Sequence, residues 1–175
     1  MYYLIRETLT PCTEEELRAF REPFAAVLTS AEWSAKRDIF EMGIDLDLDS
    51  ASPRVTKTMT NIDSLTGSVV RPNLTTRRDR KEGAFSFVLD EKGIILVDDS
   101  SYTAALTEQI SQSRHWKYPG LERFIYDLLE TVIADDLAFW EQTEQKMSRI
   151  EEDILNGKQI PFLRNSMISA VTCWT

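Results

Sequence analysis

Residues 84–99 read AFSFVLDEKGIILVDD, and this stretch decides the fold. Two runs rich in aromatic and β-branched residues, 84–89 and 94–97, flank the turn-forming segment 90–93, a pattern typical of a β-hairpin. The second run is apolar at every position, so neither face of its strand is suited to water. The sequence therefore predicts an α/β fold in which residues 94–97 form an interior strand between layers of helices.

Further strands are expected upstream of this hairpin. Residues 55–60 and 65–70 are rich in β-branched side chains and are separated by the turn segment 61–64, which predicts a second hairpin. Near the N-terminus, residues 2–5 are β-prone and Pro11 is expected to close this first strand. Together these segments indicate a mixed sheet.

Two helices are expected between the first strand and the second hairpin. Thr13 is followed by Glu16 at the spacing of a capping box, which predicts a helix start. Apolar residues continue this helix at helical spacing as far as Leu28, although Pro23 is expected to end or kink it. The segment 30–42 repeats the start signal and predicts a second, short helix.

The C-terminal half is expected to be helical. Asp98 and Asp99 are interpreted as caps of one helix. From Pro119 to about residue 156 we expect one long helix, because residues 121–156 contain neither Gly nor Pro. Such a helix is roughly 55 Å long, more than the diameter of a domain of this size, so we expect it to project.

The long helix carries two different apolar patterns. Its first part has a broad apolar face, which predicts packing on a core; its members are Leu121, Phe124, Ile125, Leu128, Leu129, Val132 and Ile133. Beyond Asp136 the pattern narrows to Trp140, Met147, Ile150 and Ile154. A narrow stripe of this kind is typical of a helix that pairs with one partner helix. These four residues are therefore predicted to form an interface.

Three regions are expected along the chain. Residues 1–117 form an α/β domain, residues 118–157 form the long helix, and residues 158–175 form an irregular or truncated tail. The N-terminus lacks the charge and hydropathy pattern of a signal peptide, and no stretch approaches the ~20 apolar residues of a membrane span. The chain is accordingly expected to be soluble and intracellular.

Composition limits the possible functions. The 175 residues include 29 acidic and 20 basic side chains, a net charge of −9, which disfavours binding to nucleic acid. His115 is the single histidine, and Cys12 and Cys173 lie near opposite ends, so neither a zinc site nor a catalytic Ser–His or Cys–His pair is indicated. His115 itself is predicted to be a solvated loop residue. No enzymatic activity is expected.

An acidic cluster at Asp45, Asp47 and Asp49 is the best candidate for binding chemistry. It resembles the opening of a calcium loop, but Ser50 and Thr56 stand where that loop requires Gly and Glu. Weak Mg²⁺ binding is compatible with the cluster, because one or two carboxylates with retained waters suffice for this ion. A solvated acidic loop is the alternative interpretation.

A resemblance to a known family emerges from the order of these parts. The segments that carry it read FSFVLDEKGIILVDD (85–99), LERFIYDLLE (121–130), DDLAFWE (135–141) and IEEDILNGK (150–158). They resemble the cytoplasmic N-terminal domain of CorA-like divalent-cation transporters over residues 84–158. Upstream the similarity lies in the order of elements and in residues 52–55, Ser-Pro-Arg-Val, which resemble a strand start of that family.

This resemblance implies an α/β/α sandwich with a mixed sheet, followed by a long projecting stalk helix. It also implies a homo-oligomer, pentameric in the full-length family, at the cytoplasmic face of the cell membrane. Mg²⁺ is then the implied transported and regulatory ion, sensed by carboxylates between subunits, and Asp45 matches one such position. The sequence has neither the family's transmembrane helices nor its Gly-Met-Asn signature, so the chain is not expected to conduct ions by itself. Without them we expect a weak dimer or a monomer in solution. A stand-alone soluble adaptor that uses the long helix is the alternative function.

Overall fold

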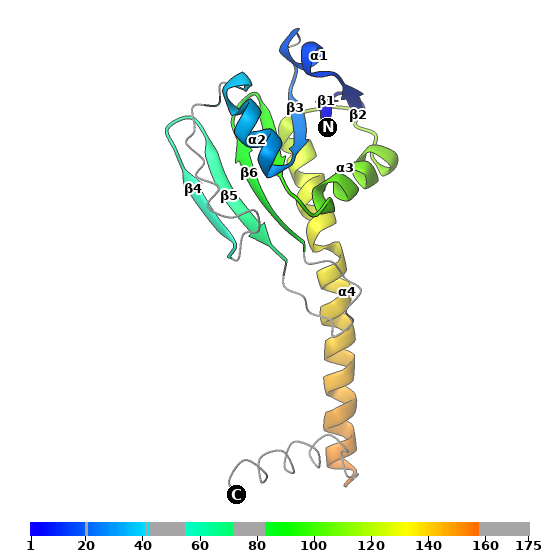
Figure 1. Ribbon diagram of the computed structural model, residues 1–175. Coiled ribbons are helices and arrows are strands. Elements are labelled where there is room, and N and C mark those ends of the chain that lie inside the picture. The colour runs from blue at the N-terminus through cyan, green and yellow to red at the C-terminus, as the bar shows by residue number, and fades with distance from the viewer. Residues whose placement is uncertain (20, 41, 43–54, 72–82, 158–175) are drawn as a thin grey trace, which may run out of the picture. The chain divides into compact units, whose positions relative to one another are not determined.

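A computed structural model describes residues 1–19, 21–40, 42, 55–71 and 83–157 (Figure 1). Its strands are β1 (Tyr2–Ile5), β2 (Leu9–Cys12), β3 (Phe24–Leu28), β4 (Lys57–Thr60), β5 (Leu65–Val70), β6 (Ala84–Leu89) and β7 (Gly93–Val97). Its helices are α1 (Glu14–Ala19), α2 (Ser30–Lys36), the 3-10 turn η1 (Arg37–Ile39), α3 (Tyr102–Ser113) and α4 (Leu121–Leu155).

The described strands form one mixed sheet in the order β2-β1-β3-β7-β6-β5-β4. Only β3 and β7 pair in parallel among these strands, and both predicted hairpins, β4–β5 and β6–β7, are present. β7 lies between β3 and β6, and all five of its residues are buried. The prediction of an interior strand at residues 94–97 is thus confirmed.

The helix predicted to start at Thr13 is present, but its predicted continuation to Leu28 is wrong. The helix that starts after Thr13 ends at Ala19, and Phe24–Leu28 form β3, which is buried at every position. Pro23 precedes this strand, and its ring favours an end to the helix there. The run Phe-Ala-Ala-Val-Leu has apolar side chains for both faces of the sheet, and tertiary burial outweighs the helix propensity of its two alanines.

Helices cover both faces of the sheet, as Figure 1 shows for α2 on one side and α3 with α4 on the other. Alternate residues of β3 separate into two cores: Ala25 and Val27 pack with α3 and α4, and Ala26 and Leu28 pack with α1 and α2. This alternation follows from the two-residue period of a strand. The predicted α/β/α sandwich with a mixed sheet is confirmed.

The predicted helix caps are also present. Thr29 and Glu32 form a capping box at the start of α2, and Thr13 and Glu16 exchange the corresponding bonds at α1. Asp98 accepts hydrogen bonds from the backbone N–H groups of Ser100 and Thr103 at the start of α3. Asp99 instead accepts from the backbone and hydroxyl of Ser30, so it holds the start of α2.

An ion pair fastens the two short helices to the sheet. The Lys36 ammonium of α2 donates to Glu14 Oε2 of α1 at 2.7 Å and to the Tyr2 hydroxyl of β1 at 3.0 Å. The bond from Lys36 lowers the pKa of Glu14, and the bonds to Glu14 and Tyr2 raise the pKa of Lys36. Because these groups are at the surface, their main effect is to fix geometry.

Helix α4 runs without a break over 35 residues, as predicted. The chain divides into two compact units, Met1–Val132 and Ile133–Thr175, so the division falls inside this helix. The domain boundaries that the sequence suggests, after residues 117 and 157, remain a prediction.

Candidate functional site: an apolar stripe on the long helix

The second unit exposes large apolar side chains along α4. We call this set the apolar stripe; its members are Ile133, Leu137, Trp140, Met147, Ile150 and Ile154. Each of them is between 47% and 61% exposed. All four residues predicted to form an interface belong to the stripe, so the structure leaves them accessible to a partner. Whether a partner covers them remains a prediction.

The stripe follows a heptad repeat. Ile133, Trp140, Met147 and Ile154 recur every seven residues, which places them on one side of an α-helix at the a positions. Leu137 and Ile150 lie four and three residues from the nearest preceding member of this series, beside the same line. This geometry suits the packing of side chains into the surface of a second helix.

Two residues predicted to face the core are exposed instead. Leu129 and Ile133 belong to the predicted broad apolar face, yet about half of each side chain is accessible. Phe124, Leu128 and Val132 occupy the core-facing side of α4 in the first unit and are buried. The heptad repeat of the stripe extends back to Ile133 in the sequence. This repeat is the signal that could have identified Ile133 as an exposed member of the stripe.

A buried polar cluster holds the first turns of α4 to the first unit. Asp127 is fully buried, and its Oδ2 accepts a hydrogen bond of 2.6 Å from the indole N–H of Trp116. Arg114 Nε lies 3.8 Å from Asp127 Oδ1, and Arg123 Nε lies 3.7 Å from Oδ2. The Trp116 ring also meets Phe124 edge-on. These contacts fix which side of α4 faces the core in this unit.

The predicted metal ligands lie outside the described residues. This applies to Asp45, Asp47 and Asp49, so their prediction as an Mg²⁺ site stays open. Within the described ranges, no three side chains of Cys, His, Asp or Glu lie close enough to share a metal ion.

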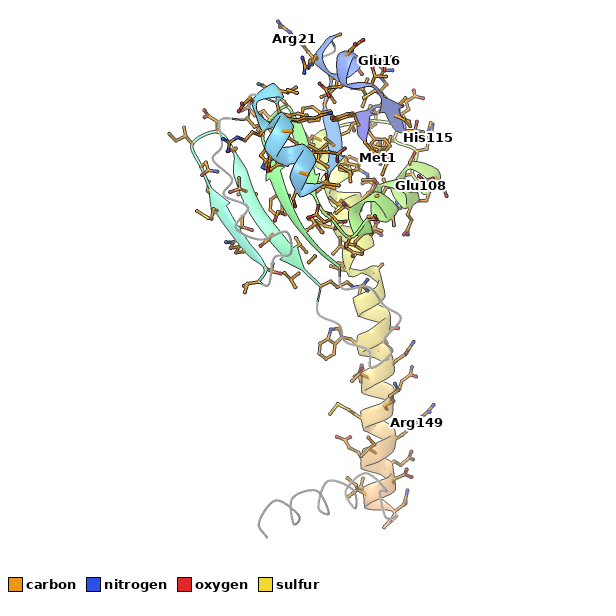
Figure 2. All side chains as sticks on the ribbon, in the orientation of Figure 1. Met1, Glu16, Arg21, Glu108, His115 and Arg149 are labelled. Atoms are coloured by element: carbon orange, nitrogen blue, oxygen red, sulfur yellow. The ribbon has the colours of Figure 1, made fainter. Side chains whose placement is uncertain are left out.

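His115 lies at the surface of the first unit, where Figure 2 labels it. Its side chain is largely exposed, and its Nε2 is 4.0 Å from Glu7 Oε2. Its exposure agrees with the prediction of a solvated loop histidine.

A cleft of about 970 Å³ opens in the first unit between α1, η1 and the β6–β7 turn. Leu17, Phe24 and Phe40 are buried in its apolar floor. Its charged lining residues are three basic and three acidic: Arg18, Arg21, Lys92, Glu22, Asp38 and Glu91. Arg18 is paired with Glu14 and Glu22 with Arg6. A balanced, partly paired lining does not select a ligand by charge.

Comparison with known proteins shows a related fold but does not assign the chain to a family. No protein-family model matches the sequence, and no curated protein matches it. Solved structures do match: the full-length CmaX protein superposes with a TM-score of 0.62 at 9% sequence identity, over 90% of this chain and 52% of CmaX. The chain therefore spans about half the length of CmaX, and at this identity the likeness establishes the fold alone.

No helix in the described ranges combines the length and the hydropathy that crossing a bilayer requires.

Proposed function

We propose that the chain is the cytoplasmic regulatory and assembly domain of a CorA-like transporter of Mg²⁺ or another divalent cation, without enzymatic turnover. The observation that carries the proposal is an α/β/α core followed by α4, which is 35 residues long and exposes an apolar stripe. A surface of this kind suits contact with other helices of an assembly. The order of elements that resembles the CorA-like family supplies the functional class.

In this proposal the domain senses the ion that the transporter carries. Asp45, Asp47 and Asp49 would supply oxygen ligands, which a hard ion such as Mg²⁺ prefers. Three carboxylates within five residues repel one another, and a bound dication relieves that repulsion. Affinity is expected to be roughly millimolar or weaker, because Mg²⁺ retains much of its water shell.

Assembly is the second part of the proposal. Copies of the chain are expected to form a homo-oligomer at the cytoplasmic face of the membrane, and this oligomer is expected to be a pentamer when membrane-spanning segments hold it together. Within such an assembly, burial of stripe area against a helix other than a second α4 contributes about 25 cal/mol per Å². The chain by itself would not conduct ions.

The reading frame of the native gene beyond Thr175 tests this proposal directly. We expect it to encode two apolar segments of ~20 residues with a Gly-Met-Asn sequence near them. A frame that continues without such segments contradicts the transporter function.

A soluble adaptor that binds a partner through α4 is the second candidate, favoured by the exposure of the stripe. A stop codon directly after Thr175 in the native gene would support it over the transporter domain.

A further inference from the structure

The apolar stripe is bordered by acidic side chains. Between Ile133 and Leu155, α4 carries seven acidic and two basic residues, a net charge of −5. In the heptad register of the stripe, the e positions are Leu137, Glu144 and Glu151, and the last two place carboxylates where they flank a partner helix. Lys146 and Asp153 occupy g positions, and their opposite charges sum to zero. The border of the stripe is therefore negative.

This border discriminates between possible partners. A second α4 would bring another helix of charge −5 to within the 8–10 Å that separates packed helices. That distance is about one Debye length at physiological salt, so repulsion between the two flanks is only partly screened. In an antiparallel pair e positions face e positions, and Glu144 and Glu151 would meet acidic counterparts. A helix whose own apolar residues are flanked by Lys or Arg would instead be attracted to the acidic flanks of the stripe.

We propose that the apolar stripe binds an amphipathic helix whose apolar residues are flanked by Lys and Arg, and that its acidic flanks disfavour pairing with a second α4. The inference rests on the proposed assembly role, since it names the partner chemistry of that contact surface. Trp140 near the centre of the stripe is the expected anchor, because large aromatic side chains dominate helix-binding surfaces. The flanking carboxylates supply specificity, mainly by rejecting acidic helices.

Two synthetic helical peptides of about four heptads test the proposal on the whole chain. Both have Ile at a and Leu at d, and they differ only in having Lys or Glu at every e and g position. Fluorescence anisotropy of the labelled peptides measures both affinities at physiological salt. We expect the Lys peptide to bind at least about tenfold more tightly than the Glu peptide.

Variants separate stripe binding from general attraction to an acidic protein. The double variant Trp140→Ala with Ile150→Ala keeps every charge and is expected to lower the affinity for the Lys peptide by at least about tenfold. Glu144→Lys with Glu151→Lys is expected to reverse the preference between the peptides. The matched control, Glu91→Lys with Glu108→Lys, makes the same charge change in the first unit, where Figure 2 labels Glu108, and is expected to preserve the preference.

Three results would overturn the proposal. They are equal binding of the two peptides, binding that Trp140→Ala with Ile150→Ala leaves unchanged, and a dimer of the free chain at neutral pH that this same double variant dissolves. Sedimentation velocity detects the dimer, and far-ultraviolet circular dichroism verifies that each variant is folded. None of these results concerns the reading frame beyond Thr175, so failure here and failure of the transporter assignment are distinguishable.

Discussion

Replacing Trp116 by Phe tests the polar cluster that holds α4 to the first unit. The substitution keeps an aromatic ring beside Phe124 but removes the indole N–H that donates to Asp127 Oδ2 at 2.6 Å. Among the described residues, Oδ1 of the same carboxylate accepts no hydrogen bond. The variant therefore leaves a fully buried carboxylate without this donor.

The expected loss of stability follows from these contacts. Orphaning a buried charged acceptor costs about 1.5–3 kcal/mol, and the smaller ring adds about 1 kcal/mol for the space it leaves. Arg114 and Arg123 remain 3.7–3.8 Å from the carboxylate, which keeps the cost near the lower end. We expect a total of about 2.5 kcal/mol, or a Tm lower by about 5–10 °C.

Urea denaturation followed by far-ultraviolet circular dichroism measures this loss. A double-mutant cycle with Asp127→Leu separates the hydrogen bond from the cavity, because the apolar variant has no carboxylate to orphan. We expect a coupling of about 1.5–3 kcal/mol between the two sites. The matched control is Trp140→Phe at an exposed position, expected to change the free energy of unfolding by less than about 0.5 kcal/mol. A coupling below about 0.5 kcal/mol would refute the assigned role of this bond.

Four further predictions concern other parts of the chain. Thr29→Ala removes the α2 cap and is expected to cost about 1 kcal/mol at neutral pH by urea denaturation. The bond from the Thr29 N–H lowers the pKa of Glu32 below its ordinary 4.5, so the stability contributed by Glu32 is present above that pH and lost as pH falls through the lowered pKa. Glu32→Gln should therefore flatten the acid limb of a stability–pH profile, and an unchanged limb contradicts this. Gly93→Ala places a Cβ 2.5 Å from the Phe24 carbonyl oxygen, and we expect a loss of at least about 2 kcal/mol or insoluble protein. Mg²⁺ titration by NMR should shift the backbone amides of residues 44–50 at millimolar concentrations, and static amides there would remove the proposed ion site.

The sheet was predictable where the sequence pattern had one physical interpretation. Residues 94–97 are apolar at every position and follow a turn, so an interior strand was the only arrangement that hides both faces. Residues 24–28 were assigned to a helix because their apolar positions also fit a helical period, and parallel pairing with β7 is not visible in a local pattern. Pro11 was expected to end a strand but lies in the edge strand β2, where a missing N–H is tolerated.

The stripe was predictable only in part, because exposure depends on where the core ends. Trp140, Met147, Ile150 and Ile154 stand far enough along α4 for a narrow apolar line to be recognised. Ile133 continues the same heptad line, yet it adjoins residues that do pack on the core. Val132 is buried and Ile133 is half exposed, so the change occurs between two neighbouring positions. No hydropathy value distinguishes these two β-branched residues; their directions from the helix axis do.

The first turns of α4 are therefore apolar on two sides. Phe124, Leu128 and Val132 face the core, while Tyr126 and Leu129 are about half exposed at the heptad positions that the stripe continues. A helix with apolar residues on opposite sides removes both of them from water only when each side has a partner. The sheet and α3 supply the partner for one side. For the other side we propose a helical partner, because the stripe has heptad spacing, and in this proposal the acidic border of the stripe restricts the charge of that helix.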